Sequence, residues 1–595
     1  MCLKIKKNKI MKKIFNFILI AALTGSFVTL FSCSDEYLEK EPPGSAAGTV
    51  MESSEGIEAL LIGTYSSVQG QQRFGGALGT DWTYGGGASD DCYKGTSTGD
   101  QNNFNAVERY EALPSNAYMS NRWQDCYDGV ARSNLTLEFL WTVQGGDNPI
   151  DDARATVVEA EAKFLRAWFH FKATRVFWKI PYVKTQTELG ETLPEEVPND
   201  SEGWDDIEAD LQYAIDNLPE TSPLGEVGRA TKYAAMAVKA HAHMYQNELS
   251  SAKPLLDEII NSNVFSLVDN YNDNFDMTTE NNAESIFEIQ AATSGSNHSA
   301  LVLAGPCMHQ SGPAGLGWGF YQPSQNLFEA FQVSDEGLPV LDVADREPLA
   351  HDMGVASSVA FTPTDHFLDP RVDWTISRRG IDFLGWGICE GASWIRQQDN
   401  GGPYMTKKFM HKAENQSLNA YGRGFDNGKN FRAIRYGHIL LWRAEVAVEE
   451  NELDYARQLV NMIRERAKGS DVVMGKVSTT VFDGNEIVVD WTQPAANYKV
   501  EPYPVGAVAF ATQEEARKAV RLEERLEFAT EGMRFFDLRR WGIIADVLNA
   551  YIAEDVKFRT FLTGAVFNSE EDDYWPLPES QLDLQDVLQQ DPAYQ

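Results

Sequence analysis

Aromatic side chains set among glycines are the residues whose type and spacing best suit chemistry with a ligand. Seven of them fall in three glycine-rich stretches: Trp82, Tyr84 and Tyr93 in residues 70–103, Trp318 and Tyr321 in residues 312–321, and Trp386 and Trp394 beside Gly387 and Gly391. A flat ring on such a loop can cover the apolar C–H face of a sugar while nearby polar side chains bond its hydroxyls. The alternative is that the same rings cap the protein's own core. Loop position and side-chain chemistry make all seven candidate ligand-binding residues.

Catalytic and metal-binding motifs occur only as fragments. Residues 95–99, Gly-Thr-Ser-Thr-Gly, have the spacing of a nucleophile elbow, but the polar residues on both sides do not predict its strand and helix. His241 and His243 lie two apart on a predicted helix and therefore do not share the face that a zinc pair needs. Residues 272–276 lack the glycine and the distal glutamate of a calcium-binding loop. We therefore expect no enzyme, no cofactor and no metal site.

Amphipathic helices must provide the framework for these loops. In residues 161–178, Phe164, Trp168 and Phe171 follow the i, i+4, i+7 spacing of one helix face. Further helices are predicted at 54–69, 204–218, 231–245, 252–260, 435–450, 455–467, 514–530 and 533–541, and a strand at 285–290. Paired helices with alanine at their crossings predict a mostly α fold, a degenerate tetratricopeptide-repeat scaffold with large loop-rich insertions and few short strands. An irregular α-helical domain is the alternative.

The N-terminus has the features of a bacterial lipoprotein signal. Lys12 and Lys13 precede an apolar run over residues 15–31, and Leu30-Phe31-Ser32-Cys33 resembles a lipobox. We expect residues 1–32 to be a signal peptide, Cys33 to carry the lipid and residues 33–50 to form a tether. An ordinary secretory signal is the alternative, and Met11 could be the true start.

Composition limits the partners and the stabilising chemistry. The formal net charge of −36 disfavours nucleic acid and anionic lipid headgroups as partners. A hydrophobic content of 43% is enough for a sizeable core. Beyond Cys33 only Cys92, Cys126, Cys307 and Cys389 remain, which excludes a disulfide-rich scaffold. One bridge, such as Cys92 to Cys126, or buried free thiols are both compatible with this count.

Short motifs in a fixed order resemble the SusD/RagB family of Bacteroidetes outer-membrane lipoproteins across essentially the whole mature chain. They are Cys33-Ser34-Asp35-Glu36-Tyr37-Leu38-Glu39, Glu161 to Ala167 with Ile180-Pro181, Gly228-Arg229-Ala230-Thr231, Ile286-Phe287-Glu288, Asp369-Pro370-Arg371, Glu523-Glu524-Arg525, Glu531 to Gly542 and Trp575-Pro576-Leu577-Pro578. The end, Gln590-Asp591-Pro592-Ala593-Tyr594, departs mildly from the Gln-Asn-Pro-Gly-Tyr expected there.

This resemblance implies a cell-surface protein anchored to the outer membrane by its lipid. It implies a SusD-like helical region over residues 51–265 and a C-terminal region with ligand-face insertions over 266–595. It also implies a partner, a TonB-dependent SusC-like barrel over which the lipoprotein sits as a hinged lid. Arg525 and Glu531 are expected to form helix-pairing ion pairs, while the ligand residues of the family lie in variable loops and do not transfer by motif.

The resulting expectation is a non-catalytic glycan-binding lipoprotein that captures oligosaccharides or polysaccharides and delivers them to the barrel. A peptide-binding member of the same import system is one alternative. A lid with little binding of its own is another.

Overall fold

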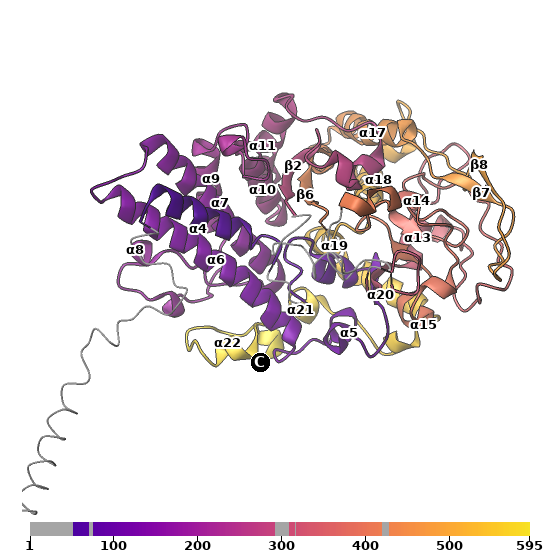
Figure 1. Cartoon of the computed structure of the whole chain (residues 1–595), viewed down its shortest axis with the longest axis horizontal. Helices are drawn as coiled ribbons and strands as arrows, with labels where there is room; N and C mark the ends of the chain where they lie inside the picture. Colours follow the sequence, from indigo (N-terminus) through magenta and orange to yellow (C-terminus); the bar gives the residue numbers. More distant parts are fainter. Residues whose placement is uncertain (1–51, 71–74, 292–308, 316, 419–427) are drawn as a thin grey trace, which may run out of the picture. The chain divides into compact units, whose positions relative to one another are not determined.

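The helices predicted from apolar spacing are present in the computed structural model, which describes residues 52–70, 75–291, 309–315, 317–418 and 428–595 (Figure 1). The longer helices are α4 (Ser54–Tyr65), α6 (Ala117–Gln144), α7 (Asp152–Phe177), α9 (Trp204–Asn217), α10 (Lys232–Tyr245), α11 (Leu249–Asn261), α16 (Tyr436–Glu449), α17 (Leu453–Gly469), α18 (Gln513–Phe528) and α20 (Ile544–Asp555). Shorter helices are α5 (Asn102–Glu108), α8 (Gln186–Leu189), α13 (Gln325–Ala330), α14 (Val372–Thr375), α15 (Gln398–Gly401), α19 (Arg534–Arg540), α21 (Ser569–Asp572) and α22 (Glu579–Leu582). Cys33, Cys307 and the leader before residue 52 lie outside the described residues.

The long helices pack one on the next. Helix α6 lies against α7, α7 against α9, α9 against α10 and α10 against α11. Helix α11 then packs on α16, far along the sequence, and α16 packs on α17 and α18. The chain divides into residues 1–56 and one compact unit of residues 57–595, and this succession of helices lies within the second unit.

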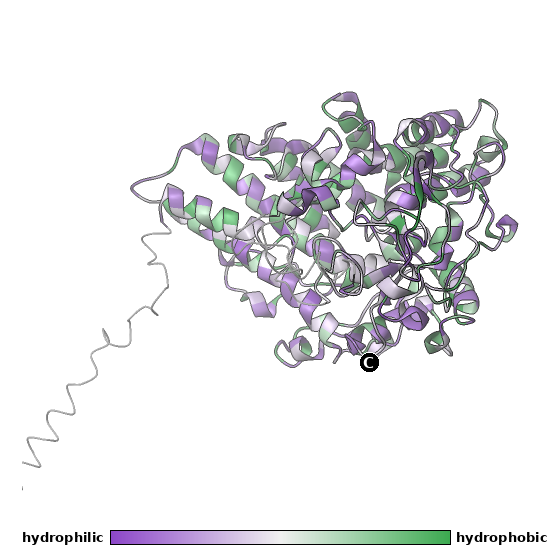
Figure 2. Ribbon diagram, turned by 45° about the vertical axis from the view of Figure 1, so that its right-hand side comes forward, coloured by the Kyte–Doolittle hydropathy of each residue, from purple (hydrophilic) through white to green (hydrophobic). Residues whose placement is uncertain are grey.

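The apolar face of α7 forms part of the main core, as its spacing predicts. Phe164, Trp168 and Phe171 are buried, and Phe287 meets the rings of Phe164 and Trp168 edge-on, at 5.1 Å in both cases. Phe287 belongs to the strand predicted at 285–290, which is present as β2 (Ser285–Ile289). Figure 2 shows apolar and polar residues alternating around the long helices, as expected of helices that bury one face. None of the described helices is long and apolar enough to cross a membrane.

The strands are short and form four two-stranded antiparallel sheets among the described residues. They are β1 (Cys92–Gly95) with β3 (Phe320–Pro323), β2 with β6 (Phe431–Arg435), β4 (Ile376–Ser377) with β5 (Met405–Thr406), and β7 (Met474–Val477) with β8 (Val489–Pro494). In the first sheet Cys92 pairs with Pro323 and Gly95 with Phe320. This pairing joins two loop-rich segments that are distant in the sequence.

The glycine run before β1 allows a close approach of the backbone to the core. Residues Trp82–Gly87 form a π-helical turn, η1, within a segment expected to be loop. A Cβ atom on Gly85 would lie 1.7 Å from the carbonyl oxygen of Gly532, and one on Gly86 would lie 1.8 Å from the hydroxyl of Tyr321. Only glycine fits at these two positions, so the run has a packing role.

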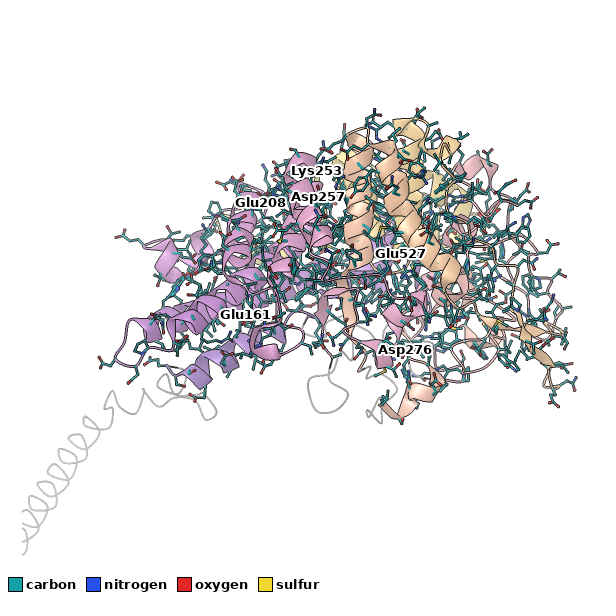
Figure 3. All side chains as sticks on the ribbon, turned by 90° about the horizontal axis from the view of Figure 1, so that it is seen from above. Glu161, Glu208, Lys253, Asp257, Asp276 and Glu527 are labelled. Carbon is teal, nitrogen blue, oxygen red and sulfur yellow. The ribbon has the colours of Figure 1, made fainter. Side chains whose placement is uncertain are left out.

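Ion pairs link the two halves of the helix succession. Asp257 and Lys253 project from α11 toward α16 (Figure 3). The Asp257 carboxylate accepts from Arg443 Nε at 2.6 Å, and Lys253 pairs with Glu450. These contacts reinforce the packing between helices that are far apart in sequence.

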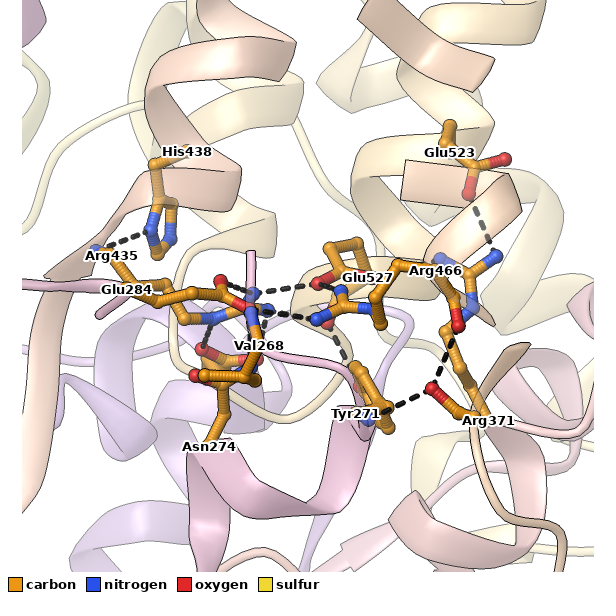
Figure 4. A network of polar contacts seen from close by, with 12 residues as sticks. Val268, Tyr271, Asn274, Glu284, Arg371, Arg435, His438, Arg466, Glu523 and Glu527 are labelled. Atoms are coloured by element: carbon orange, nitrogen blue, oxygen red, sulfur yellow. Dashed lines mark hydrogen bonds and ion pairs between the residues drawn. The ribbon is translucent and has the colours of Figure 1, made fainter. Parts of the chain in front are cut away.

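A buried ion network joins α17, α18 and β6 (Figure 4). Glu527 on α18 accepts from Arg435 at 2.6 Å, from Arg371 at 2.9 Å and from Arg466 on α17. Burial alone would raise the pKa of Glu527, but the three guanidinium groups hold it well below its ordinary range. The network therefore keeps one buried carboxylate charged.

The two predicted ion-pairing residues do form buried ion pairs, and one of these pairs joins the ends of two neighbouring helices. Arg525 pairs with Asp90 and Asp91, both at 2.9 Å, just before β1. Glu531 pairs with Lys408 at 2.8 Å and with Arg435 at 3.0 Å. Arg525 ties α18 to the segment before β1, whereas Glu531, which follows α18, reaches Arg435 at the start of α16.

Of the two alternatives for the cysteines, a Cys92–Cys126 bridge is wrong and buried free thiols are confirmed among the described residues. Both thiols are free and buried, as is Cys389. Burial raises the pKa of Cys126 to about 12, so this thiol is not poised to react at neutral pH.

Candidate functional site

Five of the seven predicted aromatic residues are core residues, which corrects their assignment as ligand-binding rings. The buried five are Trp82, Tyr84, Tyr93, Tyr321 and Trp394, none more than 6% exposed. The ring of Trp82 packs on Phe104 at 5.4 Å and on Tyr321 at 5.7 Å. The Tyr84 hydroxyl donates to the Tyr118 carbonyl oxygen at 2.7 Å, so its polar end is also satisfied inside the protein. Rings enclosed in this way cannot stack on a ligand.

The remaining two rings, Trp318 and Trp386, are half-buried. The indole N–H of Trp386 donates to the His411 carbonyl oxygen at 3.0 Å, which fixes that ring against the loop after β5. Trp318 lies two residues before β3, at a point where the chain meets β1.

The β1–β3 pair brings two loops together beside Trp318. The loop after β1 begins at Thr96, whose N–H donates to the carbonyl oxygen of Gly319 at 2.6 Å. His309 approaches the same point, because it forms a backbone bridge with Gly317. The strand pair therefore places residues 96–101 next to residues 317–319.

A third segment, around α15, adds polar side chains to this place. The Arg396 guanidinium donates to the Asp100 carboxylate at 2.6 Å and to the Thr96 hydroxyl at 2.7 Å. Gln397 accepts from the Thr98 N–H at 3.2 Å. The side chains of Arg396 and Asp100 keep 38% and 29% of their surface exposed, so both remain accessible to a ligand.

The buried side chain of Lys94 fixes the loop after β1 through its backbone carbonyl oxygens. Its ammonium group donates to the carbonyl oxygens of Ser97 at 3.0 Å, Thr98 at 3.4 Å and Asp100 at 2.8 Å. The side chain is buried, and burial lowers the pKa of Lys94 to about 8, although Glu108 and Asp100 act in the opposite direction. The ammonium is therefore still charged at neutral pH and fixes the curvature of this loop.

A buried arginine connects this loop to α15. Arg559 donates to the Asn400 carbonyl oxygen at 2.8 Å and to Glu108 at 2.9 Å. The Glu108 carboxylate in turn accepts from the backbone N–H of Lys94 at 2.8 Å. The Asn400 side chain donates to the Gly95 carbonyl oxygen at 2.8 Å. These contacts preorganise the site before any ligand binds.

His309 is uncharged at this site at neutral pH. Burial lowers the pKa of His309, and the nearby Arg396 lowers it further. Its Nδ1 lies 2.8 Å from the hydroxyl of Ser311. Nδ1 also accepts from the Ser311 backbone N–H at 3.2 Å, so the neutral imidazole carries its proton on Nε2 and offers that N–H as a donor to a hydroxyl group.

The site, defined by Thr96, Thr98, Asp100, His309, Trp318, Arg396 and Gln397, combines a half-buried indole with charged and neutral hydrogen-bonding groups. We call it the β1–β3 face. Ser97 contributes a carbonyl oxygen to Lys94, and its hydroxyl has no histidine as a hydrogen-bond partner among the described residues. Among the described residues, the Gly95–Gly99 segment thus lacks the base that a serine nucleophile needs.

One group of possible metal ligands occurs elsewhere among the described residues: Glu208, His243 and Glu248. His243 Nδ1 lies 2.8 Å from the Glu248 carboxylate and 3.4 Å from that of Glu208. Gln246 also donates to Glu208, at 2.6 Å. The three side chains therefore form a hydrogen-bonded cluster with one another and with Gln246.

His241, two residues before His243, stacks on Trp442 at 4.2 Å in the core. The two histidines therefore have different surroundings, as their spacing predicts.

Sequence reasoning missed Lys94, Asp100, His309 and Arg396. Arg396 and Asp100 are 296 positions apart, and no local pattern connects them. The one available signal is the Gly-Thr-Ser-Thr-Gly segment, whose small polar residues are typical of a tight loop.

The comparisons with known proteins agree with this helical architecture. A model of the SusD family matches residues 283–594, and a second family model, described as starch-binding and associating with the outer membrane, matches residues 36–244. The chain belongs to the SusD family. Among curated proteins it is similar to SusD-like protein P25 of Formosa agariphila, with 26% identity over 543 residues, 89% of this chain and 90% of that protein.

Solved structures show the same fold. The SusD superfamily protein of Bacteroides vulgatus has a TM-score of 0.65 at 21% identity, covering 91% of this chain and 99% of that one. A surface glycan-binding protein A from Bacteroides thetaiotaomicron, solved in complex with laminarihexaose, has a TM-score of 0.62 at 20% identity, covering 90% and 99%. The mostly α, SusD-like scaffold predicted from the sequence is confirmed.

Proposed function

We propose that this protein binds oligosaccharides at the β1–β3 face and delivers them to a TonB-dependent SusC-like transporter in the outer membrane. In this proposal the lipid on Cys33 anchors it to the cell surface, where it acts as a lid for the transporter. It takes no part in catalysis.

The observation that carries the binding site is the set of contacts between Arg396, Asp100 and Thr96 beside Trp318. A sugar ring has apolar C–H faces and a rim of hydroxyl groups. An indole can cover the former, while a guanidinium and a carboxylate can bond the latter. Family membership and the laminarihexaose-bound relative support a carbohydrate as the ligand.

The test is affinity electrophoresis and calorimetry of the purified protein against a panel of polysaccharides that includes starch and laminarin, together with a pool of basic peptides. We expect binding to at least one glycan. Arg396→Ala and Trp318→Ala should each weaken it at least tenfold, about 1.4 kcal/mol.

Arg517→Ala is the matched control. Arg517 forms an exposed bidentate pair with Glu449 on the helical scaffold, and its side chain is 34% exposed, close to the 38% of Arg396. This variant should bind as the wild type does. Wild-type affinity in Arg396→Ala would contradict the site, and binding of peptides alone would assign the protein to peptide import.

A further inference from the structure

A cavity separate from the β1–β3 face lies between the end of α7 and the C-terminal segment. Its volume is about 290 Å³, at the lower limit of small-molecule pockets. Trp178, Lys179, Asp200 and Gln589 are among its lining residues, and none of the residues that define the β1–β3 face lines it.

The walls of this cavity are held by reciprocal hydrogen bonds. The Asn199 side chain donates to the Gln589 carbonyl oxygen and accepts from the Gln589 N–H, both at 2.9 Å. The Gln590 side chain accepts from the Leu577 N–H at 3.0 Å and donates to its carbonyl oxygen at 2.9 Å. The C-terminal segment is therefore fixed against residues 177–200, and the cavity is preformed.

Trp178 occupies a backbone position that disfavours a bulky side chain. It ends α7 with φ 62° and ψ −98°, a region that glycine adopts without strain and tryptophan does not. Its indole N–H donates to Glu202 at 2.8 Å, and the Tyr574 ring stacks on it at 5.9 Å and 27°. A strained residue whose ring is fixed in the wall of a cavity points to a role for that ring.

Polar groups near this ring are available for a ligand. The Lys179 ammonium lies 4.7 Å from the centre of the Trp178 ring, a contact that a flexible side chain can exchange for another. The side chains of Asp200 and Gln589 form no hydrogen bond or ion pair with the described part of the chain. The cavity thus offers one indole with an ammonium, a carboxylate and an amide group.

We propose that this cavity is a second glycan-binding site, which takes the end of an oligosaccharide on Trp178. The sugar would displace the Lys179 ammonium from the ring, and Lys179, Asp200 and Gln589 would bond its hydroxyls. This inference rests on the proposed glycan-binding function but concerns a separate place. Two sites on one body would also strengthen binding to a long polysaccharide that can reach both.

Trp178→Gly tests the proposal without endangering the fold, because glycine removes the ring and also relieves the positive φ. The probes are maltohexaose and laminarihexaose. Calorimetric titration with each of them gives the number of binding sites. We expect two sites in the wild type, one in Trp178→Gly with the affinity of the other unchanged, and one in Arg396→Ala. The melting temperature of Trp178→Gly should stay close to that of the wild type, because relief of the positive φ offsets part of the loss of the contacts with Glu202 and Tyr574.

Asp200→Ala is the second variant, with Asp147→Ala as its control on another exposed loop. Asp200→Ala should weaken the second site about tenfold, and Asp147→Ala should change neither site.

A single site in the wild type, lost in Arg396→Ala, would overturn the second site and leave the proposed function intact. Two sites retained in Trp178→Gly would also overturn it. If neither hexasaccharide binds, the second site is overturned. If no polysaccharide of the panel binds either, the proposed function is overturned as well.

Discussion

Lys94 is the residue on which the shape of the β1–β3 face depends most. Its three N–H groups match three carbonyl oxygens of one loop. A neutral amine has two N–H groups and no charge, so loss of the proton would leave one of these contacts unmade and weaken the others. The conformation of the loop is therefore linked to the protonation of a buried amine.

Replacing Lys94 with methionine keeps the length of the side chain and removes the charge. We expect Lys94→Met to weaken glycan binding about tenfold, because charge-assisted hydrogen bonds that each contribute about 1.5–3 kcal/mol no longer hold the loop. The measurement is calorimetry between pH 6.5 and 9.5. Wild-type affinity should fall as the pH passes about 8, the pKa of Lys94, while the affinity of Lys94→Met should not show this step.

The stability of the fold should respond to Lys94 in the opposite direction. Since its folded pKa, about 8, lies below the ordinary value of 10.5, the buried ammonium lowers stability below pH 8. That penalty fades as the pH rises toward 10.5. A loss of affinity above pH 8 that came with a matching loss of stability in the wild type alone would contradict this account.

At the scale of elements, the Glu527 network determines how α17, α18 and β6 meet. Its carboxylate is fully buried and bonded by three arginines from different segments. Removing one partner of a buried ion pair leaves uncompensated charge, which typically costs about 3–5 kcal/mol. The network is therefore sensitive to the loss of a single charge.

Glu527→Gln should accordingly lower the free energy of unfolding by about 3–5 kcal/mol, measured by urea denaturation. Glu449→Gln is the control, because Glu449 forms an exposed pair with Arg517 and should change stability by less than about 1 kcal/mol. Equal changes in the free energy of unfolding for the two substitutions would show that the buried network stabilises the fold no more than an exposed ion pair does.

The elements that sequence could predict are those whose pattern is local. Helix α7 follows from the spacing of Phe164, Trp168 and Phe171, and its existence needs no distant partner. Strands β1 and β3 have four residues each and pair across the sequence, so no periodicity reveals them. Glycines beside Trp82 and beside Trp318 look alike in the sequence, yet the first ring is buried and the second half-buried. Burial is decided by tertiary packing, which is why the candidate rings could be proposed but not sorted.

At the scale of the whole molecule, an acidic surface is combined with a core of paired charges. The chain has 87 Asp and Glu residues against 51 Lys and Arg residues. At neutral pH this excess repels itself and lowers the stability of the compact state. Inside, Asp90 and Glu531 are held by basic partners that outweigh burial and lower the pKa of each to about 2.

These two features predict a melting temperature that rises as the pH is lowered from 8 to about 5 and then falls steeply below about 4. The rise follows from partial neutralisation of the acidic surface. The fall follows from protonation of Asp90 and Glu531: their pKa values are lowered by folding, so their stabilisation is present above the ordinary values of 3.8 and 4.5 and is lost as the pH approaches 2. Each contributes about 2–3 kcal/mol.

Salt separates the two causes. Surface repulsion is screened by added sodium chloride, whereas buried pairs are screened much less. Calorimetric melting in 0.02 M and about 0.5 M salt should therefore show a flatter slope between pH 8 and 5 at high salt, with the decline below pH 4 retained. A decline in acid that disappears in high salt would locate the sensitive carboxylates at the surface and contradict the role of Asp90 and Glu531. If salt leaves the rise in melting temperature between pH 8 and 5 unchanged, that rise would instead come from buried groups such as Glu280. Burial raises the pKa of Glu280 to about 7.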